Sequence, residues 1–129
     1  WFYYDSSRSK WLSDNMYAFQ GSQLGTATNV YSYLDDLGIR YTSTVGHIAL
    51  VDLCIVEGYV LTATNSTCTV QLRDDGVSVA TLSLSSSRTA TSTSLNSATI
   101  AAGSVVGTYV SGTANNGHAT TFYARRVAT

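Results

Sequence analysis

The sequence predicts an all-β domain, a jelly-roll-like antiparallel β-sandwich. Glycines separate segments that are rich in Val, Thr, Tyr and Ile, the residue types that favour strands. Two turn signals, Asp75-Gly76 and Asn116-Gly117, divide the second half of the chain. From residue 46 onward the chain offers about six strands at the spacing of a sandwich or jelly roll. A chain of 129 residues fits one domain with one core.

Residues 47–56 form the first expected strand. The segment is almost continuously apolar, interrupted only by Asp52, which predicts a strand buried on both faces. Residues 67–73 form the next strand and alternate between apolar and polar side chains. The apolar side chains on its predicted core face are those of Cys68, Val70 and Leu72.

A tight hairpin turn is expected at Asp74-Asp75-Gly76, because an Asp-Gly pair adopts the positive φ angles that such turns need. Residues 77–84 should then pair back on the preceding strand. The Ser/Thr-rich residues 85–94 are interpreted as a connection, followed by a short strand at residues 95–100.

The last two strands are expected at residues 104–111 and 118–127. Ala101-Ala102-Gly103 turns the chain before them, and Asn115-Asn116-Gly117 is a strong turn signal between them. Residues 14–45 show no decisive periodicity and are interpreted as irregular with short strands.

The charge balance excludes some partners. Seven Lys and Arg residues stand against eight acidic residues, so no positive field is available to attract nucleic acid or an anionic membrane. No apolar run reaches the roughly 18 residues of a spanning helix, so membrane insertion is not expected. Low charge with abundant Ser, Thr and Tyr suits extracellular or virion proteins. Cys54 and Cys68 are either bridged between neighbouring strands or two small buried apolar residues.

Candidate catalytic groups are scarce. His47 and His118 are isolated, and no spacing typical of a transition-metal site surrounds them. Asp35-Asp36 and Asp74-Asp75 are interpreted as turn residues, with calcium binding as the alternative. We therefore predict no catalytic residue, no cofactor and no metal site. A small hydrolase of unrecognised type is a third hypothesis, and two carboxylates from distant strands, as in glycosidases, are not excluded by their spacing.

Aromatic residues crowd the first third of the chain. They suit subunit interfaces and stacking against sugars, or they fill the ends of the sandwich. The candidate subunit-interface residues are Phe2, Tyr3, Tyr4 and Trp11. The candidate surface-recognition residues are Tyr31, Tyr33 and Tyr41.

The segment FYYDSSRSKWLS, residues 2–13, resembles the segment that opens the C-terminal head domain of bacteriophage fibre-like and virion-decorating proteins. Residues 46–56, 67–84, 101–112 and 122–127 resemble the successive strands of that domain. Gly46-His47 and Gly103-Ser104 depart from the more usual Gly-Thr and Gly-Asp.

The resemblance implies a compact jelly-roll head without catalytic residues that assembles as a homotrimer on the virion surface. Its partners would be other virion proteins and a host receptor or glycan. Residues 1–13 would be the strand and linker by which a longer chain enters the head, and residues 14–129 the head itself. An Asp5–Arg8 pair would stabilise the turn by at most about 1 kcal/mol, which leaves most of the anchoring to the aromatic residues. The alternative function is a secreted carbohydrate-binding module.

Overall fold

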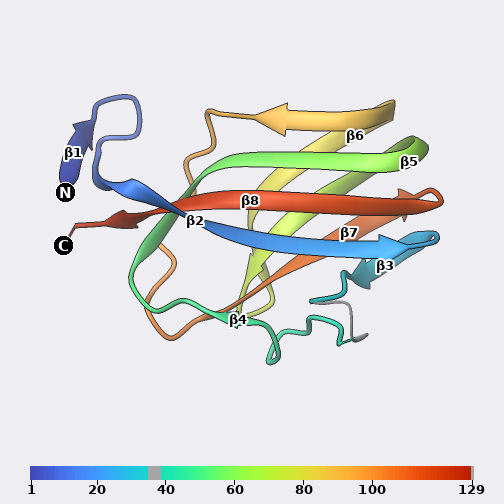
Figure 1. Ribbon diagram of the computed structural model, residues 1–129, viewed down its shortest axis with the longest axis horizontal. Helices are drawn as coiled ribbons and strands as arrows, with labels where there is room; N and C mark the ends of the chain where they lie inside the picture. The colour runs from blue at the N-terminus through green and yellow to red at the C-terminus, as the bar shows by residue number, and fades with distance from the viewer. Residues whose placement is uncertain (35–38, 129) are drawn as a thin grey trace.

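The computed structural model describes residues 1–34 and 39–128, and these form an all-β antiparallel fold, as predicted (Figure 1). The strands are β1 (Phe2–Asp5), β2 (Lys10–Leu24), β3 (Ala27–Tyr31), β4 (His47–Ile48), β5 (Leu53–Asp74), β6 (Val77–Ser92), β7 (Val105–Ala114) and β8 (Gly117–Val127). The sheet order is β1-β2-β8-β5-β7-β3, with β6 paired to β5 and β4 paired to β7.

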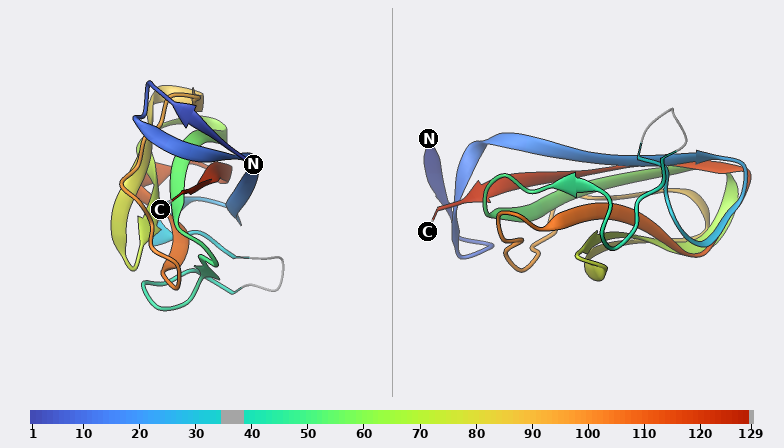
Figure 2. Two further views of the ribbon diagram at one scale, coloured as in Figure 1. Left: turned by 90° about the vertical axis from the view of Figure 1, so that its left-hand side faces the viewer. Right: turned by 90° about the horizontal axis from the view of Figure 1, so that it is seen from below.

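Two long strands, β5 and β6, belong to both layers of the sandwich (Figures 1 and 2). Residues 53–62 of β5 pair with β8, whereas residues 67–74 pair with β7. A shift in the β5–β6 register between Leu61 and Ser66 accompanies this change of layer. Layer A therefore contains β1, β2, β8, the first half of β5 and the second half of β6. Layer B contains β3, β4, β7 and the remaining halves of β5 and β6.

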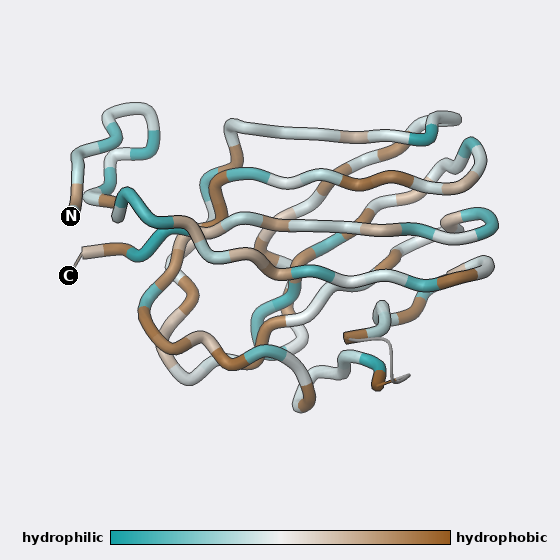
Figure 3. The backbone as a smooth tube through the Cα atoms, in the orientation of Figure 1, coloured by the Kyte–Doolittle hydropathy of each residue, from teal (hydrophilic) through white to brown (hydrophobic). Residues whose placement is uncertain are grey.

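The core lies between the layers. Phe19 and Phe122 of layer A are buried in one cluster with Val70, Leu82 and Val110 of layer B. Figure 3 shows apolar residues interspersed with polar ones along the strands. Burying each large apolar side chain stabilises the fold by about 1.5–3 kcal/mol. This burial explains why one layer cannot persist without the other.

The predicted alternation along residues 67–73 is confirmed, because the side chains of Cys68, Val70 and Leu72 are all buried. The turn at Asp75-Gly76 is confirmed as well, with φ values of 48° and 86°. Asn116 and Gly117 also have positive φ. There the chain passes from layer B to layer A, because β7 pairs with β5 and β3 while β8 pairs with β5 and β2.

Two segments that we expected to be irregular are strands. Residues 14–24 continue β2, and residues 85–92 continue β6. Many of their outward residues are polar, as at Gln20 and Ser22, and neither segment alternates regularly between apolar and polar side chains. Tertiary pairing supplies the stability instead, with β8 beside β2 and β5 beside β6.

One expected strand is interrupted, because residues 49–52 lie between β4 and β5, and another, at residues 95–100, is largely absent. In the run 47–56, His47 and Ile48 form a short exposed strand, Ala49 is buried outside any strand, and the continuously buried part begins at Leu53, where β5 starts. Residues 49–52, between the two strands, hydrogen-bond to the turn that follows Ile100. In that turn the Asp52 carboxylate accepts the Ala102 N–H at 2.9 Å. Residues 95–100 form no strand, and their strand-like pairing is limited to one isolated bridge between Ile100 and Leu53.

Candidate functional site

The segment around the opening motif is a hairpin that lies at one end of the sandwich, where both termini also lie (Figures 1 and 2). We call residues 1–13 the N-terminal hairpin. β1 pairs with the start of β2 from Phe2↔Ser13 to Asp5↔Lys10. The strand β2 continues without a break past residue 13 to Leu24.

An ion pair closes the hairpin turn. Arg8 Nη1 lies 2.7 Å from Asp5 Oδ2, as expected from the sequence. The Asp5 carboxylate also accepts the Ser7 hydroxyl at 2.7 Å and the Arg8 N–H at 3.0 Å. Hydrogen bonds from Ser7 and Arg8 lower the pKa of Asp5 to about 2. The carboxylate therefore stays ionised over the whole neutral range.

Arg8 also fastens the hairpin to the sandwich. Its Nε donates to Leu95 O at 2.6 Å, and its Nη2 donates to Val56 O at 3.0 Å and Thr93 O at 2.8 Å. Lys10 Nζ donates to Ser97 O at 2.9 Å. We expected aromatic residues to supply most of the anchoring. The structure adds the basic side chains of Arg8 and Lys10, which donate to carbonyl groups of β5 and of residues 93–97.

The four predicted interface residues of the hairpin are partly exposed in the single chain, and its fifth aromatic residue, Trp1, is almost fully exposed. Phe2, Tyr3, Tyr4 and Trp11 expose 40%, 37%, 51% and 55% of their surface. The rings of Tyr4 and Trp11 meet edge to face, with centroids 5.4 Å apart. These residues do not fill the end of the sandwich, so their apolar surface is available to another molecule.

Tyr41 is not a surface-recognition residue, which corrects our expectation. Its side chain is completely buried and its hydroxyl donates to Gln20 O. Burial raises the pKa of the Tyr41 phenol far above its usual value. Its ring packs on Gly107, where an added Cβ would lie 2.7 Å from the ring. The missing side chain at residue 107 makes the space for the tyrosine.

Tyr31 is half-buried at the outer face of layer B, beside two residues that we did not predict. Its ring meets the ring of Tyr109 edge to face at 4.9 Å. The guanidinium carbon of Arg73 lies 3.4 Å from the Tyr109 ring centroid and 5.4 Å from that of Tyr31. We call Tyr31, Gln71, Arg73 and Tyr109 the layer B cluster. Alternation places Gln71 and Arg73 on one face, but only the strand register places the tyrosines beside them.

Tyr33 lies on the edge between the layers rather than in this cluster. It bridges Ser22 of β2 and also Arg40. The Arg40 guanidinium lies 4.1 Å from the Tyr33 ring centroid, and its Nη1 donates to Tyr31 O at 2.6 Å. Arg40 therefore fixes the position of Tyr33 and the backbone of Tyr31 together.

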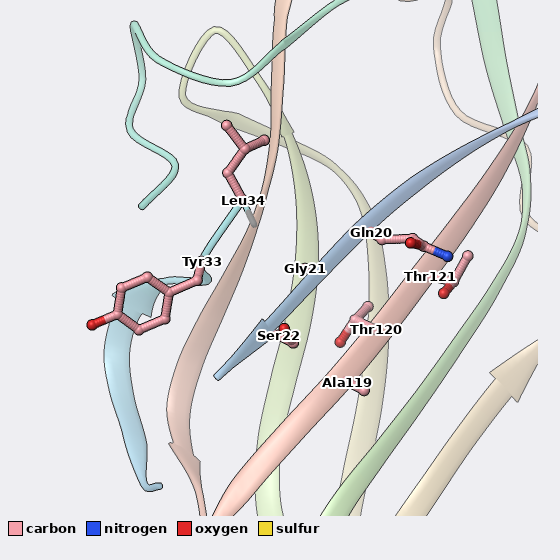
Figure 4. Close-up of a pocket in the computed structure, with 8 residues that line it drawn as sticks. All are labelled: Gln20, Gly21, Ser22, Tyr33, Leu34, Ala119, Thr120 and Thr121. Carbon is pink, nitrogen blue, oxygen red and sulfur yellow. The ribbon is translucent and has the colours of Figure 1, made fainter. Parts of the chain in front are cut away.

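A hollow of about 450 Å³ lies beside Tyr33 (Figure 4). Its lining comes from β2, β8 and the segment after β3: Gln20, Gly21, Ser22, Tyr33, Leu34, Ala119, Thr120 and Thr121. Among the residues that line the hollow, Tyr33 is the only one with a titratable side chain. The hollow therefore offers hydroxyl and amide groups rather than an acid and a base.

The two histidines are separate, and each is used structurally. His118 is buried and its Nε2 lies 2.8 Å from Ser32 Oγ. Burial, with a smaller contribution from nearby Arg40, lowers the pKa of His118 to about 4. His47 is exposed and packs against the rings of Phe19 and Tyr41. Partial burial also lowers the pKa of His47.

Over residues 1–34 and 39–128, no group of three His, Cys, Asp or Glu side chains could hold a metal ion. Asp35 and Asp36 lie outside the described residues, and Asp75 lies in the β5–β6 turn. Cys54 and Cys68 are unbridged and buried in two different clusters. Of the two alternatives for these cysteines, the structure therefore supports the buried thiols.

The described part of the chain contains no helix that is long and apolar enough to cross a membrane. Comparison with protein-family models and with curated protein sequences gave no match.

Proposed function

We propose that this domain is a structural virion protein, the trimeric head of a fibre or a capsid decoration, which contributes to attachment at the host surface. The observation that carries the proposal is the uncovered aromatic surface of the N-terminal hairpin. Phe2, Tyr4 and Trp11 are held on a hairpin that Arg8 fastens to the sandwich, yet each side chain leaves 40% or more of its surface exposed. Preorganised aromatic residues are typical of the buried centres of protein interfaces.

The outer face of layer A offers a second surface for the same association. Cross-strand rows there place Gln20 beside Thr121 and Tyr59, and Ser22 beside Ala119 and Leu61. These side chains are small or uncharged, and Leu61 is 48% exposed. A face with little charge can be desolvated at low cost, and we assign it to neighbouring copies of this chain.

The proposal is tested by measuring molar mass with size-exclusion chromatography and light scattering. We expect a trimer at micromolar concentration, and a strict monomer would overturn the proposal. Leu61→Lys and Trp11→Ser should each shift the mass toward the monomer without altering the circular dichroism spectrum. The matched control is Thr81→Lys, which places the same charge at an exposed position of β6 on layer B and should leave the trimer intact.

A secreted carbohydrate-binding module is the second candidate function. The layer B cluster favours it, because tyrosine rings and an arginine lie together on a sheet face that is rich in hydroxyl groups. A monomer that binds glycans and loses the binding on replacement of Tyr31 would favour the module over the virion head.

A further inference from the structure

The layer B cluster holds an arginine in a fixed position. Alternation along β5 points Gln71 and Arg73 outward, and the register places Gln71 opposite Tyr109, which is itself opposite Tyr31. Arg73 Nε donates to Gln71 Oε1 at 3.0 Å, and its Nη1 lies 3.5 Å from Tyr31 Oη. With its guanidinium also stacked on Tyr109, the side chain keeps little rotational freedom. An arginine fixed in this way loses less entropy when it binds a ligand.

The charge of Arg73 is not neutralised by the protein. Among the residues that the structure describes, the only ion pair is that between Asp5 and Arg8. Neither of the two acidic residues that follow Arg73 pairs with it: Asp74 makes no ion pair, and Asp75 accepts the Val105 N–H at 2.8 Å. A guanidinium has five N–H donors, of which Arg73 directs one on Nε and one on Nη1 to the protein. The remaining donors on Nη1 and Nη2 can bind an anion in the bidentate geometry that carboxylates favour.

The surroundings of Arg73 indicate what carries the anion. Ser78 stands opposite Arg73 and Thr81 stands opposite Gln71 on β6, and both side chains are exposed. Hydroxyl and amide groups suit the hydroxyl groups of a sugar, and the partly exposed ring of Tyr31 suits the apolar face of a pyranose.

We propose that the layer B cluster binds a carboxylate-bearing sugar, with the carboxylate on the Nη1 and Nη2 groups of Arg73 and the sugar ring against Tyr31. This inference rests on the proposed function, since it names the class of host-surface ligand that the head would contact. The same site would serve the alternative carbohydrate-binding module.

In the experiment, two acidic probes and their neutral counterparts are titrated into the full chain. Binding is measured by NMR and by calorimetry. The probes are 3′-sialyllactose against lactose, and trigalacturonate against its methyl ester. We expect binding of at least one acidic probe, at least tenfold weaker binding of its neutral counterpart, and loss of affinity as NaCl is raised. The pair that binds distinguishes a sialic acid from a uronic acid.

Variants assign the binding to the cluster. Arg73→Gln should weaken binding at least tenfold, and Arg73→Lys should weaken it less, because lysine keeps the charge but not the bidentate geometry. The matched control is Arg126→Gln, which removes the same charge from an exposed residue near the N-terminal hairpin and should leave affinity within twofold. Thermal melting of each variant shows that the fold is intact.

Equal binding of acidic and neutral probes would overturn the inference, as would unchanged affinity in Arg73→Gln. Failure of both acidic probes to bind at about 10 mM, a concentration on the order of the weakest useful dissociation constant, would also overturn it. Competition by acetate or phosphate at the same concentration as the sugar would also overturn it, because the site would then bind any small anion. A trimer without acidic-sugar binding refutes this inference alone. A monomer that binds the acidic sugar refutes the virion head alone.

Discussion

Replacing Arg8 with alanine should release the N-terminal hairpin from the sandwich. The substitution removes three hydrogen bonds from a charged donor to the carbonyl groups of Val56, Thr93 and Leu95. Hydrogen bonds to charged groups contribute about 1.5–3 kcal/mol each when buried, and about 1 kcal/mol each is appropriate where water can replace the donor. We therefore expect the free energy that docks the hairpin on the sandwich to fall by about 3 kcal/mol. This value leaves out the loss of the Asp5–Arg8 ion pair in the turn.

The chain carries its own probe for this event. Its two tryptophans, Trp1 and Trp11, both lie in the N-terminal hairpin, so tryptophan fluorescence reports the hairpin while circular dichroism at 218 nm reports the sheets. In urea, the fluorescence transition of Arg8→Ala should precede the circular dichroism transition, whereas the two coincide in the unmodified chain. If the hairpin and the sandwich unfold together, both transitions should shift, with a fall in Tm of roughly 10 °C.

Arg8→Lys is the matched variant, because it keeps the charge but cannot reach three carbonyl groups at once. It should lose a large part of the same stability. If Arg8→Ala left both transitions unchanged within about 0.5 kcal/mol, the interpretation of Arg8 as the anchor would be refuted. Measurements at two protein concentrations separate hairpin docking from subunit association.

Three further predictions concern the core. Val70→Asp should unfold the domain, at a cost above about 4 kcal/mol, because it places an unpaired charge among apolar side chains. Thr69→Asp, on the outer face, should change the free energy of unfolding by less than about 0.5 kcal/mol. Equal circular dichroism spectra of the two variants would contradict the register of this strand. Gly107→Ala should cost about 1–3 kcal/mol in urea denaturation because its methyl group would meet the Tyr41 ring, and an unchanged midpoint would show that the ring moves aside freely. The pKa of His118 is about 4 in the folded state and 6.5 in the unfolded state. Neutral His118 therefore contributes about 3 kcal/mol to the free energy of unfolding above pH 6.5, and this contribution is lost as the pH falls toward 4. Stability measured from pH 7 to 4 should show this slope, and His118→Gln should remove most of it.

The candidate surfaces were only partly predictable. The sequence drew attention to the aromatic residues of the opening motif and to Tyr31, and it predicted the pair between Asp5 and Arg8. It did not reveal the bonds from Arg8 to residues 56, 93 and 95, because those contacts span 48 to 87 positions of the chain. Tyr41 was expected at the surface and is buried, since nothing local indicates that Gly107 would make room for its ring.

By itself, the sequence determined the features that depend on neighbouring residues. Alternation along residues 67–73 settled which side chains face the core, and Asp75-Gly76 settled the turn because few other residues adopt positive φ. The tertiary structure alone decided that β5 and β6 each cross between the layers, and that Arg73 meets both Tyr109 and Tyr31. The physical reason is that strand register depends on packing between segments far apart in the chain. A polar, Ser/Thr-rich strand such as the second half of β6 carries no local signal of its partner, and its position follows from the hydrogen bonds and core contacts of the strand beside it.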